Sequence, residues 1–527
     1  MLCPKCAVEL SEASKTCPKC GYVLTATASG VGSGAAAAPA PAPASAPQRS
    51  KWRMAVLLIV PVLVLLIWYA RSAAKGYAPG ASPQMFWVEF CMVLGAILIG
   101  IRRGGVALGL IGGLGVSLLV LGFRTEPSSP PIDVMLIILA VVTAAATLQV
   151  AGGLDYMVQL AERLLRAHPK HVTLLAPFCC FVLTMCVGTG HAVYALLPVI
   201  ADVAWHTRIR PERPMAVSSV AAQMGITASP VSAAVGFFLA FAAKTSHPVS
   251  LVDILKITIP AGIVGLLAAA LWSMNRGKDL DKDPAFEKRL QDPDFAKGLD
   301  VSVTTLDKKL PRHAKSSVLL FFAGVAVIVL LALDKDFFHL GLLNIGKSTV
   351  SVILIVQMVM LAFGAFILFL TNVKAADIAR SSVFIAGMIA VVSIFGIAWM
   401  SDTFVTGNKP YLVAQMRSMV THWPWTFGIA MFCVSAFVKS QAATLAVMIP
   451  FGVALNLPNT VMLGLMPASY AYFFFCFYPS DLAAINMDRT GTTGIGKYLL
   501  NHSFMIPGLI GVGVSTVTAY LLSRVLL

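Results

Sequence analysis

The chain has 527 residues, of which 58% are hydrophobic and 12% are charged. Soluble globular proteins carry about 25% charged residues, so this composition excludes a soluble protein and predicts a polytopic membrane protein. The net charge of +15 could favour nucleic-acid binding. However, the lysines and arginines flank apolar runs, as the cytoplasmic loops of membrane proteins require, so no nucleic-acid partner is expected.

Residues 1–24 contain two cysteine pairs, Cys3 with Cys6 and Cys17 with Cys20, each pair separated by two residues. Four thiolates with this spacing suit a tetrahedral zinc ion, so we expect a small zinc ribbon. This zinc would be structural and would supply most of the ribbon's folding free energy, and no other cofactor is expected. Two disulfides, which a reducing cytosol would exclude, and a rubredoxin-like iron site are the alternatives.

An Ala/Pro-rich tether at 25–50 leads from the ribbon to an apolar segment at 51–72. The tether composition is typical of a flexible, partly extended linker. Because a metal-binding segment precedes it, we interpret 51–72 as an extra transmembrane anchor helix and not as a cleaved signal peptide. The cations before it predict a cytoplasmic N-terminus.

The first predicted repeat covers 85–274 and mixes continuous with interrupted apolar segments. Runs of spanning length predict transmembrane helices. They lie at 85–101, 104–123, 131–150 and 249–274. An amphipathic segment at 154–166 is expected along the membrane interface. Polar clusters interrupt 172–207 at Gly188-Thr189-Gly190-His191 and 215–246 near Ser229-Pro230.

The segment 275–315 carries ten Lys/Arg and eight Asp/Glu residues, which predicts a solvated cytoplasmic linker. The second predicted repeat covers 316–527. Its continuous spans are expected near 316–333, 347–371, 381–400 and 503–526, and its interrupted ones at 423–455 and 458–487.

The interruptions in the two halves recur at nearly constant spacing. Thr189 and Gln441 are 252 residues apart, and Pro230 and Pro479 are 249 residues apart. Interrupted apolar segments at matching places in two halves predict a transporter's substrate site. If 172–207 and 423–455 are re-entrant hairpins, the cation-rich loops all fall in the cytoplasm and the C-terminus falls in the periplasm. The sequence therefore predicts an all-α polytopic membrane protein with two inverted-topology repeats, re-entrant hairpins and broken helices.

Nine short stretches carry a family resemblance that runs from about Phe86 to Leu527. They are 103–109, 188–191, 210–216, 228–232, 276–283, 306–311, 478–485, 488–493 and 501–504. With these stretches the chain closely resembles the anaerobic C4-dicarboxylate transporters of the Dcu family. The resemblance implies an ion-transporter-like fold in the bacterial inner membrane. It also implies exchange of fumarate, malate or aspartate for succinate.

The zinc ribbon, the tether and the first helix are additions to the family pattern. The second hairpin also departs from it, because the family has a lysine three residues before an asparagine where this chain has Ala436 and Lys439. The cation is therefore expected about one helical turn further along the same face.

A dicarboxylate is a short dianion that must exchange its hydration for oriented donors, which the ends of broken helices supply. We expect each hairpin tip to bind one of the two carboxylates. The candidate substrate-binding residues are Gly188, Thr189, Gly190, His191, Ser229, Ser232, Ser440, Gln441, Thr444 and Ser480. Asp481 would repel an anion, so we interpret Asp481 and Lys439 as candidates for coupling or charge pairing.

Each candidate has a plainer alternative. His191 could be an interior histidine whose ring nitrogens are hydrogen-bonded within the protein. Gly188 and Gly190 could allow close helix packing. Lys439 could extend to the membrane surface. The serines could satisfy backbone groups freed at Pro230 and Pro479.

Further alternatives concern function and assembly. Sodium- or proton-coupled uptake stays open, and so does a transporter-like dicarboxylate sensor whose ribbon docks a cytosolic partner. A homodimer in the lipid bilayer is also left open. An enzyme is not expected, since the sequence has no Walker, GxSxG or HExxH motif.

Overall fold

The computed structural model describes residues 83–243, 248–299, 303–345, 348–371, 373–411, 422–476, 478–497 and 500–527. The predicted zinc ribbon, tether and anchor helix, with the cysteines at 3, 6, 17 and 20, lie outside these residues.

The first half of the described chain is helical, and its helices begin and end close to the predicted breaks. The long elements are α2 (Pro83–Arg103), α3 (Ala107–Ser117) with the π-helical turn η1 (Leu118–Gly122), α4 (Ile132–Val150), α5 (Gly153–Ala167), α6 (Val172–Val187), α7 (Val193–His206), α8 (Glu212–Met224), α9 (Ala233–Ala242) and α10 (Leu251–Met274). Two short 3-10 turns, η2 (Pro169–His171) and η3 (Gly190–Ala192), precede α6 and α7.

The linker and the second half continue in the same manner. The linker contains η4 (Leu280–Lys282), α11 (Pro284–Leu290) and α12 (Pro293–Leu299). The second half contains α13 (Ala314–Leu333), η5 (Asp334–Phe338), β1 (Asn344–Ile345), β2 (Ser348–Thr349), α14 (Val352–Thr371), α15 (Ala375–Arg380), α16 (Ser382–Gly407), α18 (Trp425–Val438), α19 (Gln441–Ala454), α20 (Asn459–Leu465), η6 (Met466–Ser469), α21 (Pro479–Met487) and α22 (Met505–Leu526). Strand β1 pairs antiparallel with β2, with Asn344 opposite Thr349.

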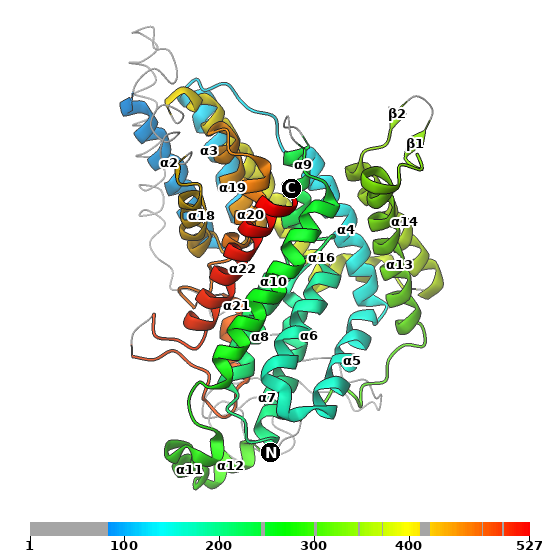
Figure 1. The fold of residues 1–527 in the computed structure, drawn as a ribbon, viewed down its shortest axis with the longest axis vertical. Helices are drawn as coiled ribbons and strands as arrows, with labels where there is room; N and C mark the ends of the chain where they lie inside the picture. Colours follow the sequence, from blue (N-terminus) through cyan, green and yellow to red (C-terminus); the bar gives the residue numbers. More distant parts are fainter. Residues whose placement is uncertain are drawn as a thin grey trace, which may run out of the picture. The chain divides into compact units, whose positions relative to one another are not determined.

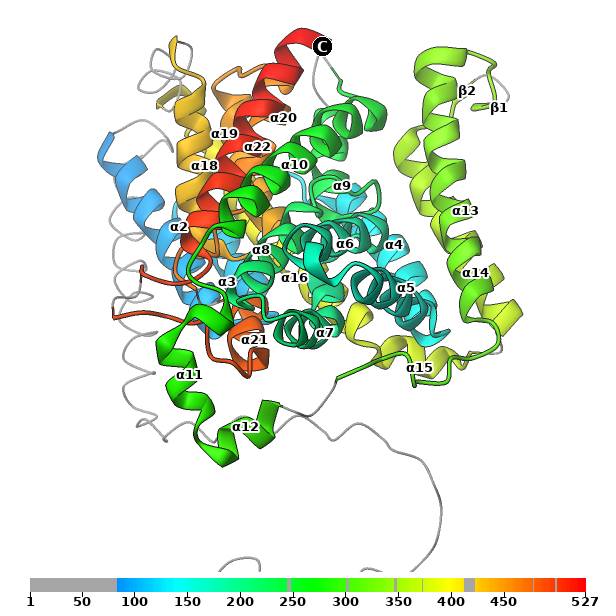
Figure 2. The same cartoon turned by 60° about the horizontal axis from the view of Figure 1, so that its bottom comes forward.

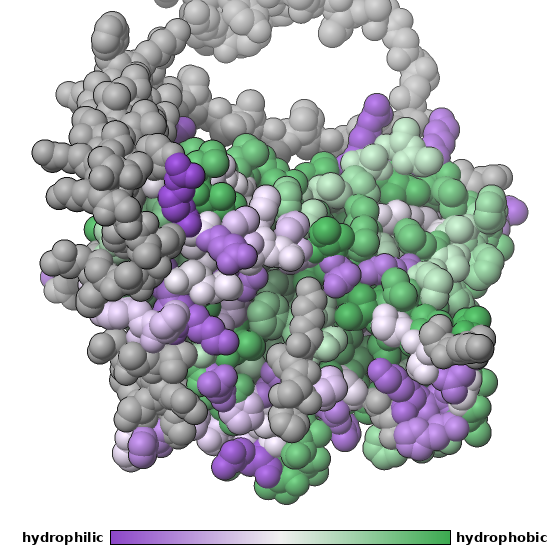
Figure 3. Space-filling model, turned by 90° about the horizontal axis from the view of Figure 1, so that it is seen from above, coloured by the Kyte–Doolittle hydropathy of each residue, from purple (hydrophilic) through white to green (hydrophobic). Residues whose placement is uncertain are grey.

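The helical surface is apolar enough for a bilayer. In the part of the chain that the structure describes, seven helices are long and apolar enough to cross a membrane. Large apolar side chains are exposed both on these helices, as at Phe369 of α14, and on the shorter apolar segment of α3 and η1, as at Leu110 and Leu121. Figure 3 shows hydrophobic residues over much of one face, with polar residues between them. Exposed apolar area of this kind is typical of a surface that contacts lipid.

Helices from the two halves of the chain pack against each other throughout the described core. α3 packs against α16, α4 against α14, and α10 along α22 (Figure 1). The linker helices α11 and α12 lie at one end of the helices, together with α15, whereas β1, β2 and the C-terminus lie at the other end (Figure 2). The long-range packing therefore depends on both halves together.

The amphipathic helix α5 buries polar as well as apolar side chains. Its polar residues Gln159 and Glu162 are buried, whereas Leu164 is exposed. The reason is that Gln159 Nε2 donates to the backbone carbonyls of Thr305 (2.7 Å) and Lys308 (2.9 Å). The polar side of α5 thus binds the end of the linker.

The linker itself is not a freely solvated segment. Arg210 pairs with Asp283 at 2.9 Å, and Arg213 pairs with Asp279 at 2.8 Å. Two of the linker carboxylates thus attach the linker to the start of α8, although other linker charges, such as Lys278 and Lys288, are exposed. Charge counting could not show this, because it does not distinguish solvated charges from paired ones.

Candidate functional site

The first hairpin tip joins α6 to α7. Helix α6 ends at Gly188, which has φ +81°, and a Cβ at this position would lie 2.6 Å from the carbonyl oxygen of Val231. Glycine is therefore required both by the left-handed conformation and by the close approach of another backbone. Thr189 follows in an extended conformation, and its Oγ1 accepts a hydrogen bond from the backbone N–H of His191 at 3.4 Å. The His191 Nδ1 lies 2.6 Å from the same hydroxyl.

The second tip joins α18 to α19 and has the same backbone geometry. Helix α18 ends at Lys439 with φ +55°, followed by an extended Ser440 whose Oγ accepts from the backbone N–H of Ala443 at 3.3 Å. The sequence predicted Lys439 one turn further along the helix face that carries Ala436. Instead, Lys439 lies at the helix end in the left-handed conformation, so its side chain leaves from the tip.

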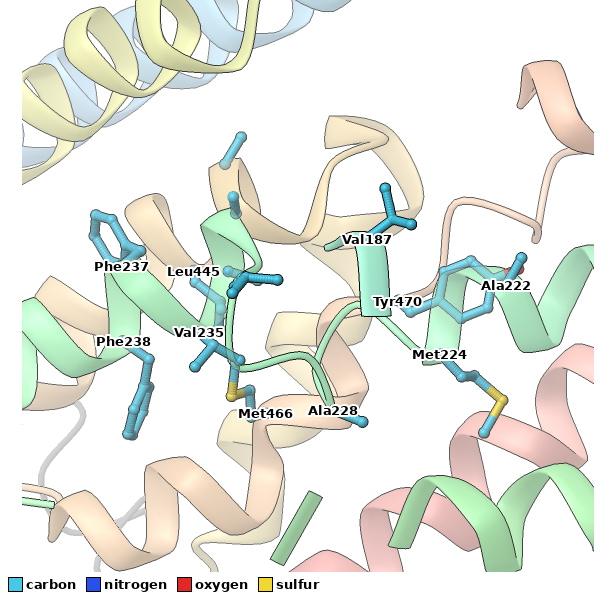
Figure 4. Close-up of a cluster of buried hydrophobic side chains, with 14 of the residues drawn as sticks. Val187, Ala222, Met224, Ala228, Val235, Phe237, Phe238, Leu445, Met466 and Tyr470 are labelled. Atoms are coloured by element: carbon cyan, nitrogen blue, oxygen red, sulfur yellow. The ribbon is translucent and has the colours of Figure 1, made fainter. Parts of the chain in front are cut away.

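Two further breaks lie beside the tips. In the first, the Ser232 Oγ caps α9 by accepting from the backbone N–H of Val235 at 3.1 Å. Apolar side chains from both halves, including Val187 and Leu445, gather around this break between α8 and α9 (Figure 4). In the second, the irregular segment after η6 ends at Pro479, which begins α21. Broken helices free backbone donors inside an apolar environment, where they are available to a ligand.

A cavity of about 140 Å³ lies where the breaks meet. Seven tip residues line it, namely Gly188, Thr189, Gly190, His191, Lys439, Ser440 and Gln441. Tyr472 and Tyr478 add two phenols, while Val141 of α4 and Ala390 of α16 belong to an apolar wall. The structure thus brings six of the ten predicted substrate-binding residues, and Lys439, to one small cavity.

The other predicted residues lie behind this cavity. Ser229, Ser232, Thr444 and Ser480 are fully buried or nearly so. The hydroxyl groups of the first three bond to nearby backbone; for example, Thr444 Oγ1 donates to the Ser440 carbonyl at 2.8 Å. The Ser219 hydroxyl donates to Asp481 Oδ1 at 2.6 Å and also lies 2.9 Å from Ser480 Oγ. These contacts favour a structural role for the four hydroxyl groups rather than contact with a ligand.

Gln223 of α8 connects the two tips, and the sequence analysis missed it. Its backbone carbonyl accepts from Gln441 Nε2 at 2.7 Å, and its side-chain Oε1 accepts from the Tyr472 hydroxyl at 2.8 Å. A Cβ on Gly190 would lie 2.5 Å from its amide nitrogen, so the first tip packs directly on this side chain. An amide within a buried helix of small residues was the available signal, because such groups need a polar partner.

A cluster of charges holds α7 to α5 and the linker. Arg166 Nη2 lies 3.0 Å from Asp202 Oδ2, and Arg166 Nε lies 2.8 Å from Glu162 Oε1. Burial raises the pKa of Glu162, but hydrogen bonds from Thr305, Arg166 and Thr304 outweigh it and hold the pKa below its ordinary value. The helix that follows the first tip is therefore attached through Asp202 to Arg166, which is also paired with the ionised Glu162.

Comparison with known proteins places the chain among transporters. The family model for "anaerobic C4-dicarboxylate membrane transporter" matches residues 85–527. The chain belongs to this family. The family predicted from the sequence is thus confirmed, and so is a polytopic helical membrane protein.

Similar proteins of the family match along nearly their whole length. The anaerobic C4-dicarboxylate transporter DcuB of Escherichia coli O6:H1 is 45% identical over 442 residues, which cover 83% of this chain and 98% of that protein. The C4-dicarboxylate transporter DcuA of Wolinella succinogenes is 37% identical over 448 residues, covering 84% and 100%. Among solved structures, the YdaH transporter of Alcanivorax borkumensis has a TM-score of 0.52 at 13% identity, covering 89% of this chain and 97% of its own. That likeness supports the fold alone.

Proposed function

We propose that this chain is a secondary active transporter of C4-dicarboxylates, namely fumarate, malate, aspartate and succinate, and that it exchanges fumarate for succinate. The observation that carries the proposal is the cavity between two hairpin tips of matching backbone geometry. Family membership supports the substrate class, because DcuA and DcuB relatives are named C4-dicarboxylate transporters. A dianion with a carboxylate at each end suits a site with one tip at each end.

The chemistry of the cavity fits a small dianion. Lys439 supplies a positive charge, and His191 and Ser440 add polar groups to the same cavity. Both tips also begin helices, whose N-terminal N–H groups carry partial positive charge and stabilise anions. The apolar wall excludes water, which strengthens these interactions relative to their value in solution.

The proposed mechanism is alternating access within two inverted-topology repeats. Matching tips at 188–189 and 439–440 support an internal repeat, as do the reciprocal pairings of α3 with α16 and of α4 with α14. In this view the tips carry the substrate while α4 and α16 form the wall against which they move. Gln223 would keep the tips in register, since it contacts both.

The proposed orientation places the linker in the cytoplasm of a bacterial inner-membrane protein. The cation-rich linker helices and α15 lie at one end, and the C-terminus lies at the other, which supports a periplasmic C-terminus (Figures 1 and 2). The zinc ribbon stays a prediction. We propose that it is an accessory module for a cytosolic partner, so exchange should survive deletion of residues 1–50.

The test is counterflow of labelled fumarate in proteoliposomes loaded with succinate, with malate, aspartate and citrate as competitors, in the presence and absence of sodium. Citrate should not compete if the cavity accepts only four-carbon dianions. His191→Ala and Gln441→Leu should each slow exchange. Unchanged exchange in both variants would contradict the two-tip site.

A further inference from the structure

A buried carboxyl group lies directly behind the proposed substrate cavity. Asp481, in the first turn of α21, is 0% exposed. Its Oδ1 accepts a hydrogen bond from the Ser219 hydroxyl of α8 at 2.6 Å. Its Oδ2 is buried and has no hydrogen-bond partner among the residues that the structure describes. One oxygen of this carboxyl group is therefore hydrogen-bonded, and the other is not.

Four phenol groups and one thiol face Asp481. Tyr194 of α7 lies close enough to interact with it electrostatically, as do four groups of the segment that leads into α21, namely Tyr470, Tyr472, Cys476 and Tyr478. In the described part of the chain no lysine, arginine or histidine forms an ion pair with Asp481. A buried carboxylate without a cation costs several kcal/mol, whereas the neutral acid costs far less.

The position of Asp481 connects it to both tips. Helix α21 packs against α7, which follows the first tip, and against α8, which carries Gln223. Tyr478 and Tyr472 line the cavity, and Tyr478 is only three residues before Asp481. Rearrangement of the broken segment on substrate binding would therefore change the surroundings of the carboxyl group.

We propose that Asp481 is the proton-binding site that couples proton movement to dicarboxylate transport. In the conformation seen here Asp481 is the neutral acid. A proton from water on one side of the membrane binds to Oδ2, and it leaves to water on the other side when rearrangement of α21 exposes the carboxylate. In exchange the outgoing dianion carries a proton back, so no net proton moves. In net uptake no proton returns, so uptake acidifies the interior.

This inference rests on the proposed transport function, and it names the second species that moves. The plainer alternative is that Asp481 stabilises the N-terminus of α21 through the helix dipole. That role would affect thermal stability without giving the transporter a pH dependence. The two readings therefore differ in a property that can be measured on the same protein.

The experiment uses the full chain in liposomes that contain a pH-sensitive dye. The wild type should acidify the lumen in proportion to net fumarate uptake. In Asp481→Asn, which resembles the neutral acid in shape, acidification per fumarate should fall by about tenfold or more, and exchange should become independent of pH. The matched control is Glu89→Gln, because Glu89 of α2 is another buried acid, held by Asn408 at 2.5 Å, away from the cavity. It should behave as the wild type.

A second variant tests the site without removing the carboxyl group. Ser219→Ala removes the donor that stabilises the carboxylate form, so the pH of half-maximal exchange should move upward. The inference is overturned if that pH stays unchanged, or if Asp481→Asn retains the wild-type ratio of protons to fumarate. It is equally overturned if the wild type takes up fumarate without proton movement. A wild type that does not exchange dicarboxylates at all would instead contradict the proposed function.

Discussion

The two hairpin tips have the same backbone geometry but contribute different side chains to the cavity. Both place a left-handed residue at the helix end and an extended hydroxyl residue after it, at Gly188-Thr189 and at Lys439-Ser440. In the first tip the left-handed residue has no side chain, because the backbone of Val231 occupies the space. In the second tip the same position carries a lysine that lines the cavity.

This difference shows how a repeated element can form a binding site that has different chemical groups at its two ends. The first tip brings backbone close to its neighbours and contributes His191, whereas the second contributes a cation and an amide. A non-glycine residue in the left-handed region costs roughly 1 kcal/mol, which the protein tolerates at Lys439. We infer that this cost is retained because the ammonium group is useful there.

The largest expected effect comes from making the first tip resemble the second. Gly188→Ala forces a Cβ to 2.6 Å from the Val231 carbonyl oxygen at φ +81°. We expect loss of exchange in proteoliposomes and a lower melting temperature in detergent. Gly95→Ala is the control, since a Cβ at this position of α2 meets nothing within 4 Å. Normal exchange by Gly188→Ala would mean that the first tip tolerates a different backbone.

The reverse change makes the second tip resemble the first. Lys439→Gly removes the cation but suits the left-handed conformation, so the protein should fold as the wild type does. We expect the KM for fumarate to rise by about tenfold, which corresponds to about 1.4 kcal/mol. Lys439→Arg should retain most of the affinity. A KM that is equal in Lys439→Gly and wild type would show that the ammonium group does not contact substrate.

A smaller effect on exchange is expected when the connection between the tips through Gln223 is broken. Gln223→Leu removes the acceptor of the Tyr472 hydroxyl and changes the surface on which Gly190 packs. A single hydrogen bond contributes about 0.5–1.5 kcal/mol, so exchange should slow several-fold. A double-mutant cycle with Tyr472→Phe should give a nonadditive result, because both changes break the same bond. Additive effects would argue against the connection.

The smallest effect concerns Glu162, which pairs with Arg166 in the charge cluster that holds α7 to α5. The pKa of Glu162 is lowered in the folded protein, so its contribution to stability is present above the unfolded-state pKa and is lost as the pH falls through the folded-state value. Glu162→Gln should therefore lower the melting temperature modestly at neutral pH, and this difference should shrink in acid. Thermal unfolding in detergent across acidic and neutral pH measures it. A difference that grows in acid would contradict the assignment of an ionised Glu162.

Much of the site could be predicted because helix breaks are local features. Apolar runs and the polar residues within them predicted the helix ends near Gly188 and Ser440, since spanning length and broken periodicity are visible in a short window. The resemblance over 86–527 supplied the substrate class before any contact was known. The breaks were thus available from residues near each other in the chain, and their spacing and the family followed from the order of such stretches along it.

Only the tertiary structure decided which polar residues meet the cavity. The Gln441 amide reaches Gln223 across 218 residues, and Ser219 reaches Asp481 across 262 residues. Pairing over such separations depends on how whole helices pack, and hydropathy carries no information about it. The left-handed conformation of Lys439 and the docking of the linker on α5 were hidden for the same reason. The sequence by itself determined where the helices break, and the packing of the two halves decided what the breaks hold.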